Sequence, residues 1–247
     1  MRQWNRVVIV TMAALAVAAG AAGQASGPSV DDLLARHFAA RGGLDKLKAM
    51  TTLRMSGKVE AGGQQIEMLT VSKRPNLMRQ EQTVMGRRII SAFDGTRMWV
   101  INPMTGSSTP QTVPAQQAQA MRDQADFDGP LVDYRAKGNE IEYAGTDSVE
   151  GRKTIKLKVT IKGGGSMMLD IDAESYLDAR ITREIDMGGT SAKVETLLSD
   201  FRVVSGLTMP HTIRTLFNGQ PQALTVFKTI EINVAVDDSL FQMPSKQ

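Results

Sequence analysis

The 247-residue sequence contains no cysteine. Disulfides are therefore excluded, and the domain must be stable through packing alone, even in an oxidising compartment. Lipid attachment to a cysteine and a cysteine nucleophile are excluded as well. Aromatic residues make up only 5% of the chain, and histidine occurs twice, as His37 and His211. Because no further ligands stand at metal-binding spacing beside either histidine, we expect both to be structural and predict no metal site.

The common signatures of covalent and phosphate chemistry are also missing. The chain has no Gly-x-Ser-x-Gly elbow and no Ser-x-x-Lys sequence, two patterns that supply a serine nucleophile. The three glycines at 163–165 precede no helical pattern, so they predict a hairpin turn and not a phosphate-binding loop. We therefore predict no catalytic residues and no cofactor, and a protein that is not an enzyme.

Two groups of acidic residues are explained without catalysis. Asp126, Asp128 and Asp133 surround a Gly-Pro break, and their spacing differs from that of a calcium loop. Carboxylates accept hydrogen bonds from the free N–H groups at helix N-termini, so we expect this group to cap two helices. Asp170 and Asp172 alternate near the end of an expected strand, where we expect them to be solvated.

The charge balance excludes a nucleic-acid partner. The chain has 29 basic and 26 acidic residues, and removal of Arg2 and Arg6 with an export signal would leave 27 against 26. The basic residues are spread along the chain without interleaved aromatics. A basic patch of the kind that neutralises phosphates is therefore not expected.

The N-terminus has the three parts of a secretory signal peptide. Arg2 and Arg6 provide the basic start, residues 7–19 the apolar centre, and residues 20–26 a stretch of small residues. The apolar centre is shorter than the roughly 20 residues that span a bilayer comfortably. We predict a signal peptide over residues 1–25, cut after Gly23 or Ala25, and a periplasmic domain over residues 26–247.

Methionine is unusually abundant, with 15 residues. Its unbranched side chain adapts to irregular apolar shapes, so it fills cores and also suits binding surfaces for varied ligands. The count favours an adaptable apolar cavity, although core filling explains any single methionine.

Alternation of apolar and polar residues dominates the chain after residue 52. The clearest example is the strand around residues 154–162, where Ile155, Leu157, Val159 and Ile161 alternate with Lys156, Lys158 and Lys162. This pattern predicts one buried and one wet face. Short Gly-containing turns separate the strands, which predicts a mostly β protein with about eleven strands in one antiparallel sheet.

Two helical regions interrupt this pattern. One follows Asp31 and ends at Gly42, with a short second helix over residues 44–50. The other is an insertion at about residues 114–138, which contains the Gly129-Pro130 break. A sheet of this length must curl because strands twist by about 20–25° each. We therefore expect an unclosed half-barrel with an N-terminal helix, and the insertion as a helical lid over its concave face.

The sequence resembles the LolA/LolB-like lipoprotein-carrier superfamily, in particular its bacterial outer-membrane lipoprotein-sorting branch. The segments that carry the resemblance are 42–47 (GGLDKL), 73–76 (KRPN), 93–95 (FDG) with Trp99, 102–103 (NP), 124–134 (QADFDGPLVDY) and 233–244. They follow one another in register over nearly the whole expected mature chain.

The resemblance implies an apolar cavity that receives acyl chains or other lipids, without a cofactor and without bond chemistry. It also implies a basic residue on the sheet that holds the closed lid. Four arginines are candidates for that role: Arg54, Arg79, Arg88 and Arg97.

We predict a periplasmic carrier that binds a lipid or the acyl chains of a lipoprotein for transfer toward the outer membrane. The expected partners are these acyl chains and a membrane-bound donor or acceptor protein, and the protein is expected to be a monomer. The alternative is an envelope sensor or protein-interaction domain of the same fold without a transported ligand. The candidate ligand-binding residues are Trp99, Ile101, Met121, Phe127, Leu131, Val132 and Tyr134.

Overall fold

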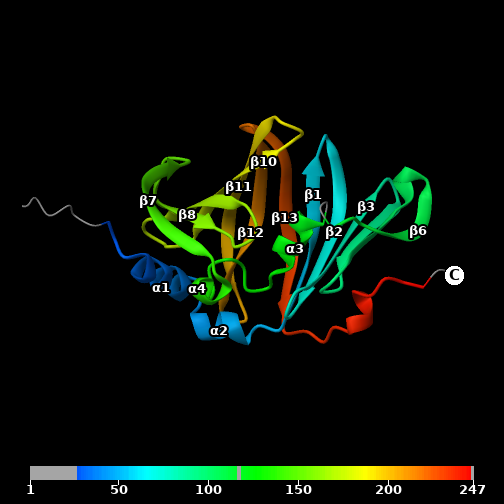
Figure 1. Ribbon diagram of the computed structural model, residues 1–247, viewed down its shortest axis with the longest axis horizontal. Coiled ribbons are helices and arrows are strands. Elements are labelled where there is room, and N and C mark those ends of the chain that lie inside the picture. The colour runs from blue at the N-terminus through cyan, green and yellow to red at the C-terminus, as the bar shows by residue number, and fades with distance from the viewer. Residues whose placement is uncertain (1–26, 116–117, 246–247) are drawn as a thin grey trace, which may run out of the picture.

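A single antiparallel sheet forms most of the protein. The computed structural model describes residues 27–115 and 118–245, and within them all thirteen strands belong to one sheet (Figure 1). The strand order is β6-β5-β4-β3-β2-β1-β13-β12-β11-β10-β9-β8-β7. Two meanders, β1–β6 and β7–β13, are therefore joined side by side through the pairing of β1 with β13.

The strands are β1 (Thr52–Ala61), β2 (Gln64–Lys73), β3 (Leu77–Val84), β4 (Arg87–Phe93), β5 (Met98–Asn102), β6 (Ser107–Thr112), β7 (Glu140–Val149), β8 (Arg152–Thr160), β9 (Ser166–Asp172), β10 (Asp178–Asp186), β11 (Ser191–Val204), β12 (Leu207–Phe217) and β13 (Gln220–Ile232). The α-helices are α1 (Val30–Ala40), α2 (Leu44–Ala49), α3 (Gln119–Ala125) and α4 (Tyr134–Lys137). Two 3₁₀ turns are η1 (Pro103–Thr105) and η2 (Asp238–Leu240).

The predicted class is confirmed: the protein is mostly β, and its antiparallel sheet is not closed into a barrel. The sheet has thirteen strands where about eleven were expected. One strand that the sequence pattern missed is β6, which contains Pro110. Proline is tolerated there because β6 is an edge strand, where a backbone N–H can face away from the ladder.

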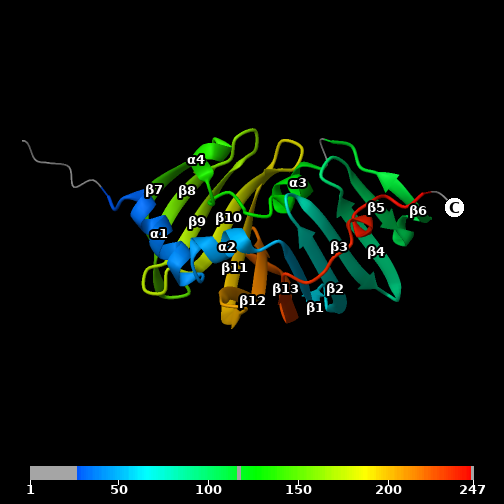
Figure 2. The ribbon, with the colours of Figure 1, turned by 90° about the horizontal axis from the view of Figure 1, so that it is seen from below.

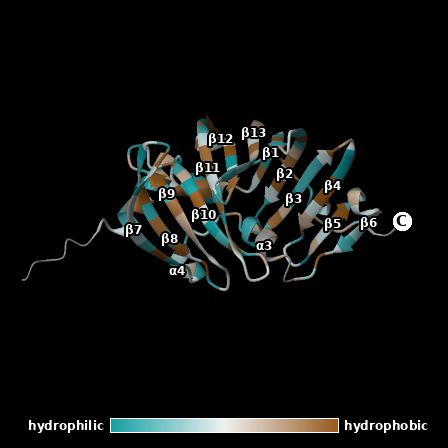
Figure 3. Cartoon of the chain, turned by 90° about the horizontal axis from the view of Figure 1, so that it is seen from above, coloured by the Kyte–Doolittle hydropathy of each residue, from teal (hydrophilic) through white to brown (hydrophobic). Residues whose placement is uncertain are grey.

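The topology explains why one segment must cross the sheet. The two edges of the sheet are β6 and β7, and the chain passes from one to the other between residues 113 and 139. We call this part the crossing segment. Figures 2 and 3 show the sheet as an arc, with α3 and α4 of the crossing segment on its concave side.

The concave side, called the inner face here, carries most of the core. Residues paired across neighbouring strands point to the same face, so the register places Met55, Phe93 and Leu157 among the inner-face side chains. Three buried clusters lie there, and α1 and α2 pack on two of them. Figure 3 shows the resulting hydrophobic and hydrophilic bands along the strands.

The C-terminal segment, residues 233–245, packs on the opposite, outer face. Trp99 pairs with Ala92 while its neighbour Met98 pairs with Phe93, so the indole points away from the inner face. Its Nε1 donates a 2.8 Å hydrogen bond to the carbonyl of Phe241, and Met243 packs on the same cluster. The C-terminal segment therefore covers an outer cluster that also contains Ile90 and Ala92.

The outer face of β7–β11 carries a partly buried ion network. Arg180 donates to Asp170 at 2.9 Å and to Asp147 at 2.8 Å, and Lys156 also donates to Asp147. The hydrogen bond from Lys156 and that from Ser148 lower the pKa of Asp147. The expectation that Asp170 and Asp172 are solvated is wrong, since both are buried. Ion pairing to neighbouring long side chains replaces water around them.

Gly57 allows β1 and β13 to approach closely at a register shift in the centre of the sheet. A Cβ atom at this position would overlap the carbonyl oxygen of Val226 and would lie 2.8 Å from the Cα of Phe227. Both are backbone atoms, so the contact cannot be relieved by a rotamer change.

We expect Gly57→Ala to lower the free energy of unfolding by about 2 kcal/mol or more, because the strands must separate. Gly165→Ala is the matched control, since a Cβ there meets nothing within 4 Å. It should change stability by less than about 1 kcal/mol. Urea titrations of both variants test this, and equal midpoints would contradict the packing argument.

Candidate functional site

The crossing segment lies on the inner face and contacts all three of its clusters. Met121 and Ala125 of α3 pack against Met78 and Phe93 of β3 and β4. Phe127 packs against the cluster that α2 forms with β12 and β13 in the middle of the sheet. Leu131 belongs to the cluster formed with α1 and β7–β9. The segment therefore runs along the whole width of the concave face.

Arg74, at the end of β2, anchors the middle of this segment. Its guanidinium donates both to Asp128 Oδ2 and, at 2.6 Å, to Asp128 Oδ1, which is a bidentate pair. It also donates to the carbonyls of Met50 and Leu47, and its Cζ lies 5.0 Å from the ring centroid of Phe127. One side chain thus ties the crossing segment to the end of strand β2 and to α2.

None of the four arginines considered from the sequence has this role. Arg54 faces Glu231 at 3.9 Å, and Arg97 faces Asp94 at 3.6 Å. Arg79 and Arg88 pair with Glu81. The KRPN sequence at 73–76 was a signal for Arg74, because it places a cation where a strand ends.

Two further ion pairs join the crossing segment to the N-terminal helices. Arg135 of α4 donates two 2.9 Å hydrogen bonds to Asp31 of α1, and Lys48 of α2 donates to Asp133 at 2.7 Å. The hydrogen bond from Arg135 lowers the pKa of Asp31, and the same contact raises the pKa of Arg135. Burial and the Asp31 contact raise the pKa of Tyr134. The Asp31–Arg135 pair therefore stays charged throughout the neutral range.

The expectation that Asp126, Asp128 and Asp133 cap helices is wrong. Neither α3 nor α4 has a side-chain cap, although Asp133 occupies the N-cap position of α4. All three carboxylates are ion-paired instead, Asp126 with Lys137 at 2.6 Å. Lysine or arginine partners distant in sequence outcompete the local N–H groups, because charged pairs form stronger hydrogen bonds.

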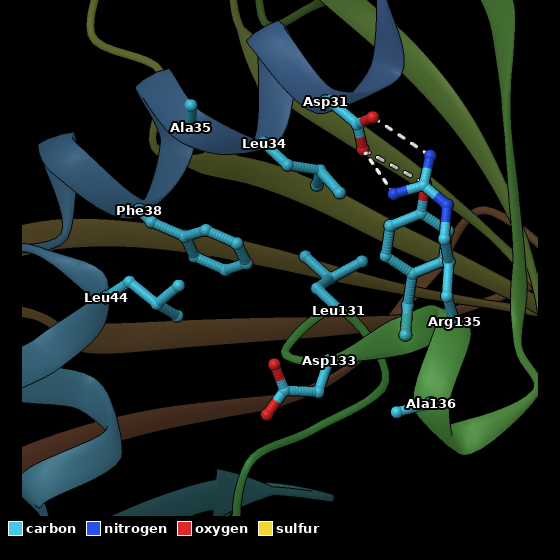
Figure 4. A pocket seen from close by; sticks show the side chains of 10 residues that line it. Asp31, Leu34, Ala35, Phe38, Leu44, Leu131, Asp133, Arg135 and Ala136 are labelled. Atoms are coloured by element: carbon cyan, nitrogen blue, oxygen red, sulfur yellow. Dashed lines mark hydrogen bonds and ion pairs between the residues drawn. The ribbon is translucent and has the colours of Figure 1, made fainter.

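A cavity of about 430 Å³ lies between α1 and the crossing segment (Figure 4). Its walls are apolar, and charged residues of both helices stand beside them. The lining residues are Asp31, Leu34, Ala35, Phe38, Leu44, Leu131, Asp133, Tyr134, Arg135 and Ala136. A pocket of this size with apolar walls and few polar groups is typical of small-molecule sites.

Methionine side chains are concentrated on the inner face. Eight methionines belong to or pack against its three clusters: Met50, Met55, Met68, Met78, Met98, Met121, Met167 and Met209. Met55 and Met68 are only half-buried, as is Ile213 beside them. The central inner face therefore presents flexible apolar side chains that are partly open to solvent.

The structure brings five of the seven candidate residues together along the crossing segment. They are Met121, Phe127, Leu131, Val132 and Tyr134, and Leu131 and Tyr134 line the cavity. Trp99 and Ile101 lie in the outer cluster, so we take them out of the candidate site. Their alternating pattern could not show which face is concave.

The histidines are packed into the domain. His37 of α1 is fully buried, and its Nδ1 donates to the carbonyl of Tyr176 at 2.9 Å. His211 is also buried, with Nδ1 3.1 Å from the carbonyl of Met209. Within residues 27–115 and 118–245, no three acidic or histidine side chains are placed to hold a metal ion.

Solved structures share this arrangement of sheet and helices. A LolA superfamily protein from Nitrosomonas europaea superposes with a TM-score of 0.57 at 13% identity, over 87% of this chain and 98% of its own. The chain has a LolA-like fold.

Two other structures with this fold agree over a similar length. A DUF1329 family protein from Desulfovibrio piger gives a TM-score of 0.58 at 14% identity, covering 85% of this chain and 95% of its own. A putative outer membrane lipoprotein-sorting protein domain from Vibrio parahaemolyticus gives 0.56 at 8% identity, covering 85% and 94%. No family model and no curated protein sequence matches the LolA-like chain significantly.

None of the helices in the described part of the chain is long and apolar enough to cross a bilayer.

Proposed function

We propose that this LolA-like protein binds a lipid or the acyl chains of a lipoprotein and carries them through the periplasm toward the outer membrane. The observation that carries the proposal is the apolar inner face, covered by a segment that charged side chains tie down. The cavity beside α1 marks a place where an acyl chain can enter along this segment. The protein acts by binding and release, without catalysis.

The energetics favour such exchange. Burying an acyl chain contributes about 0.8 kcal/mol per CH₂ group, so a dozen carbons contribute roughly 10 kcal/mol before costs. The pairs Asp31–Arg135 and Lys48–Asp133 are largely exposed, and exposed ion pairs are weak. A ligand can therefore displace the α4 end of the crossing segment and take over its apolar contacts with the sheet there.

The methionines of the inner face support a ligand of variable shape. Met side chains repack at low cost, so the same surface can accept acyl chains of different length or branching. A predicted signal peptide over residues 1–25 supports a periplasmic location, but these residues lie outside the described part of the chain. Transfer would involve a membrane-bound donor or acceptor protein, with the carrier acting as a monomer.

The first test is mass spectrometry of an organic extract of the protein purified from the periplasmic fraction. We expect a co-purified lipid or acylated peptide. A stable complex with another protein and an extract without lipid would favour the sensor alternative instead.

The second test changes the underside of the crossing segment. Leu131→Asp combined with Val132→Asp places two carboxylates at buried positions, and charged groups are costly to bury. We expect the variant to lose at least about tenfold in affinity for a fluorescent fatty acid, while the sheet stays folded.

The matched control carries Met85→Asp and Val203→Asp, at apolar positions that are 74% and 73% exposed. It should bind like the wild type. Unchanged affinity in a correctly folded Leu131/Val132 variant would overturn the assignment of the site. No binding by the wild type would overturn the carrier proposal.

A further inference from the structure

The cavity between α1 and the crossing segment combines apolar walls with charges of both signs. Leu34, Phe38 and Leu131 provide apolar walls, while Asp31, Asp133 and Arg135 also line it. Figure 4 shows Asp31 and Arg135 facing each other across one side of the cavity, with Leu34 and Leu131 beside them. The site therefore matches a ligand that has an apolar chain and a charged end.

The charged residues are at the solvent side of this cavity. The side chains of Asp31, Asp133 and Arg135 are 57%, 53% and 69% exposed, whereas Leu34 and Leu131 are buried. An acyl chain that occupies the apolar part would leave its polar end beside these three groups. Whatever headgroup the ligand carries must compete or pair with them.

Each of these charges already has a partner of opposite sign. Arg135 pairs with Asp31 within the lining, and Asp133 pairs with Lys48 of α2. An anionic headgroup that takes Arg135 releases Asp31 and then lies beside its unpaired carboxylate. A cationic headgroup that takes Asp31 releases Arg135 beside it. A headgroup with both charges can replace both partners without leaving either one unpaired.

We propose that this site prefers a zwitterionic amphiphile: an acyl chain whose headgroup carries a phosphate and a primary ammonium group. The phosphate accepts from Arg135, which offers a planar set of N–H donors suited to phosphate oxygens. The ammonium donates to Asp31. This inference rests on the proposed function, because it assumes that an acyl chain occupies the cavity.

The same exchange connects headgroup recognition to opening. The Asp31–Arg135 pair is a direct link between α1 and α4, so a headgroup inserted between them removes that link. The ligand thereby favours the state in which the crossing segment is released from α1.

The experiment compares lysolipids with identical acyl chains in binding to the purified full-length mature protein. The probes are lysophosphatidylethanolamine, lysophosphatidylglycerol and an uncharged monoacylglycerol, measured by displacement of a fluorescent fatty acid. We expect the wild type to bind the ethanolamine lipid about fivefold more tightly than either of the others, as an added charge contact supplies roughly this factor.

Two variants assign the preference to residues. Arg135→Gln should reduce binding of the ethanolamine lipid to the level of the monoacylglycerol. Asp31→Asn should remove the repulsion between the carboxylate of Asp31 and an anionic headgroup bound to Arg135. It should therefore shift the preference toward lysophosphatidylglycerol. Arg97→Gln, which replaces the exposed cation that pairs with Asp94 elsewhere on the protein, is the matched control and should leave all three affinities unchanged.

The outcomes separate this inference from the proposed function. Equal affinities for the three lipids, or a preference that survives in Arg135→Gln, would overturn the headgroup assignment while leaving the carrier proposal intact. Failure of the monoacylglycerol to bind at all would overturn the carrier proposal itself.

Discussion

Replacing Leu157 by alanine is expected to lower the free energy of unfolding by about 2–5 kcal/mol. Leu157 lies in the middle of β8, is fully buried, and packs in the cluster that α1 and Leu131 share with β7–β9. Truncation removes one methine and two methyl groups and leaves a void that the paired strands β7 and β9 prevent from closing. The lost contacts are the reason for the large effect.

Lys158→Ala is the control for this prediction, because Lys158 follows directly in the chain and is exposed on the outer face. Its ion pair with Glu142, at 3.7 Å, is also exposed. The change in stability should stay within about 0.5 kcal/mol. A urea titration that gives equal losses at both positions would show that β8 is not buried on the side we assign.

Replacing Arg74 by glutamine is expected to release the crossing segment and to lower the free energy of unfolding by about 2 kcal/mol. Hydrogen bonds to charged groups each contribute about 1.5–3 kcal/mol when well made, and Arg74 is about a quarter exposed, which reduces this figure. Glutamine cannot reproduce the bidentate contact with Asp128 together with the bonds to the carbonyls of Met50 and Leu47.

Hydrogen exchange distinguishes local release from general destabilisation. Amides at residues 126–139 should exchange faster in Arg74→Gln, while those of the central strands β1 and β13 keep most of their protection. A double-mutant cycle with Asp128→Asn should give a coupling free energy of about 1–3 kcal/mol.

Arg54→Gln is the matched control for Arg74→Gln. Arg54 lies on the outer face of the adjacent strand β1, and the one ion pair of its side chain among the described residues is the 3.9 Å pair with Glu231. The variant should leave exchange in the crossing segment unchanged. Equal protection of that segment in Arg74→Gln and the wild type would show that Arg74 does not hold it.

The sequence predicted the local elements well where a single physical signal was strong. The strands β3 and β4 begin and end close to turn residues, because Pro75, Gly86 and Gly95 bound them. The insertion at about residues 114–138 was expected to be a helical lid, but much of its described part is not helical. Among its described residues only α3 and the short α4 are α-helical, and Leu131 and Val132 lie in a turn between them. An Ala- and Gln-rich composition favours a helix but does not fix its ends.

What the sequence determined by itself is therefore periodicity: which residues of a strand share a face, where turns fall, and that the insertion interrupts the sheet. Tertiary structure decided which face is concave, and this moved Trp99 and Ile101 to the outer cluster. It also decided that Arg74 and not the other arginines meets Asp128, and that Asp170 is buried. The physical reason is that a period of two is symmetric between the faces of a strand. The curl of the sheet and ion pairs between residues far apart in sequence distinguish the two faces.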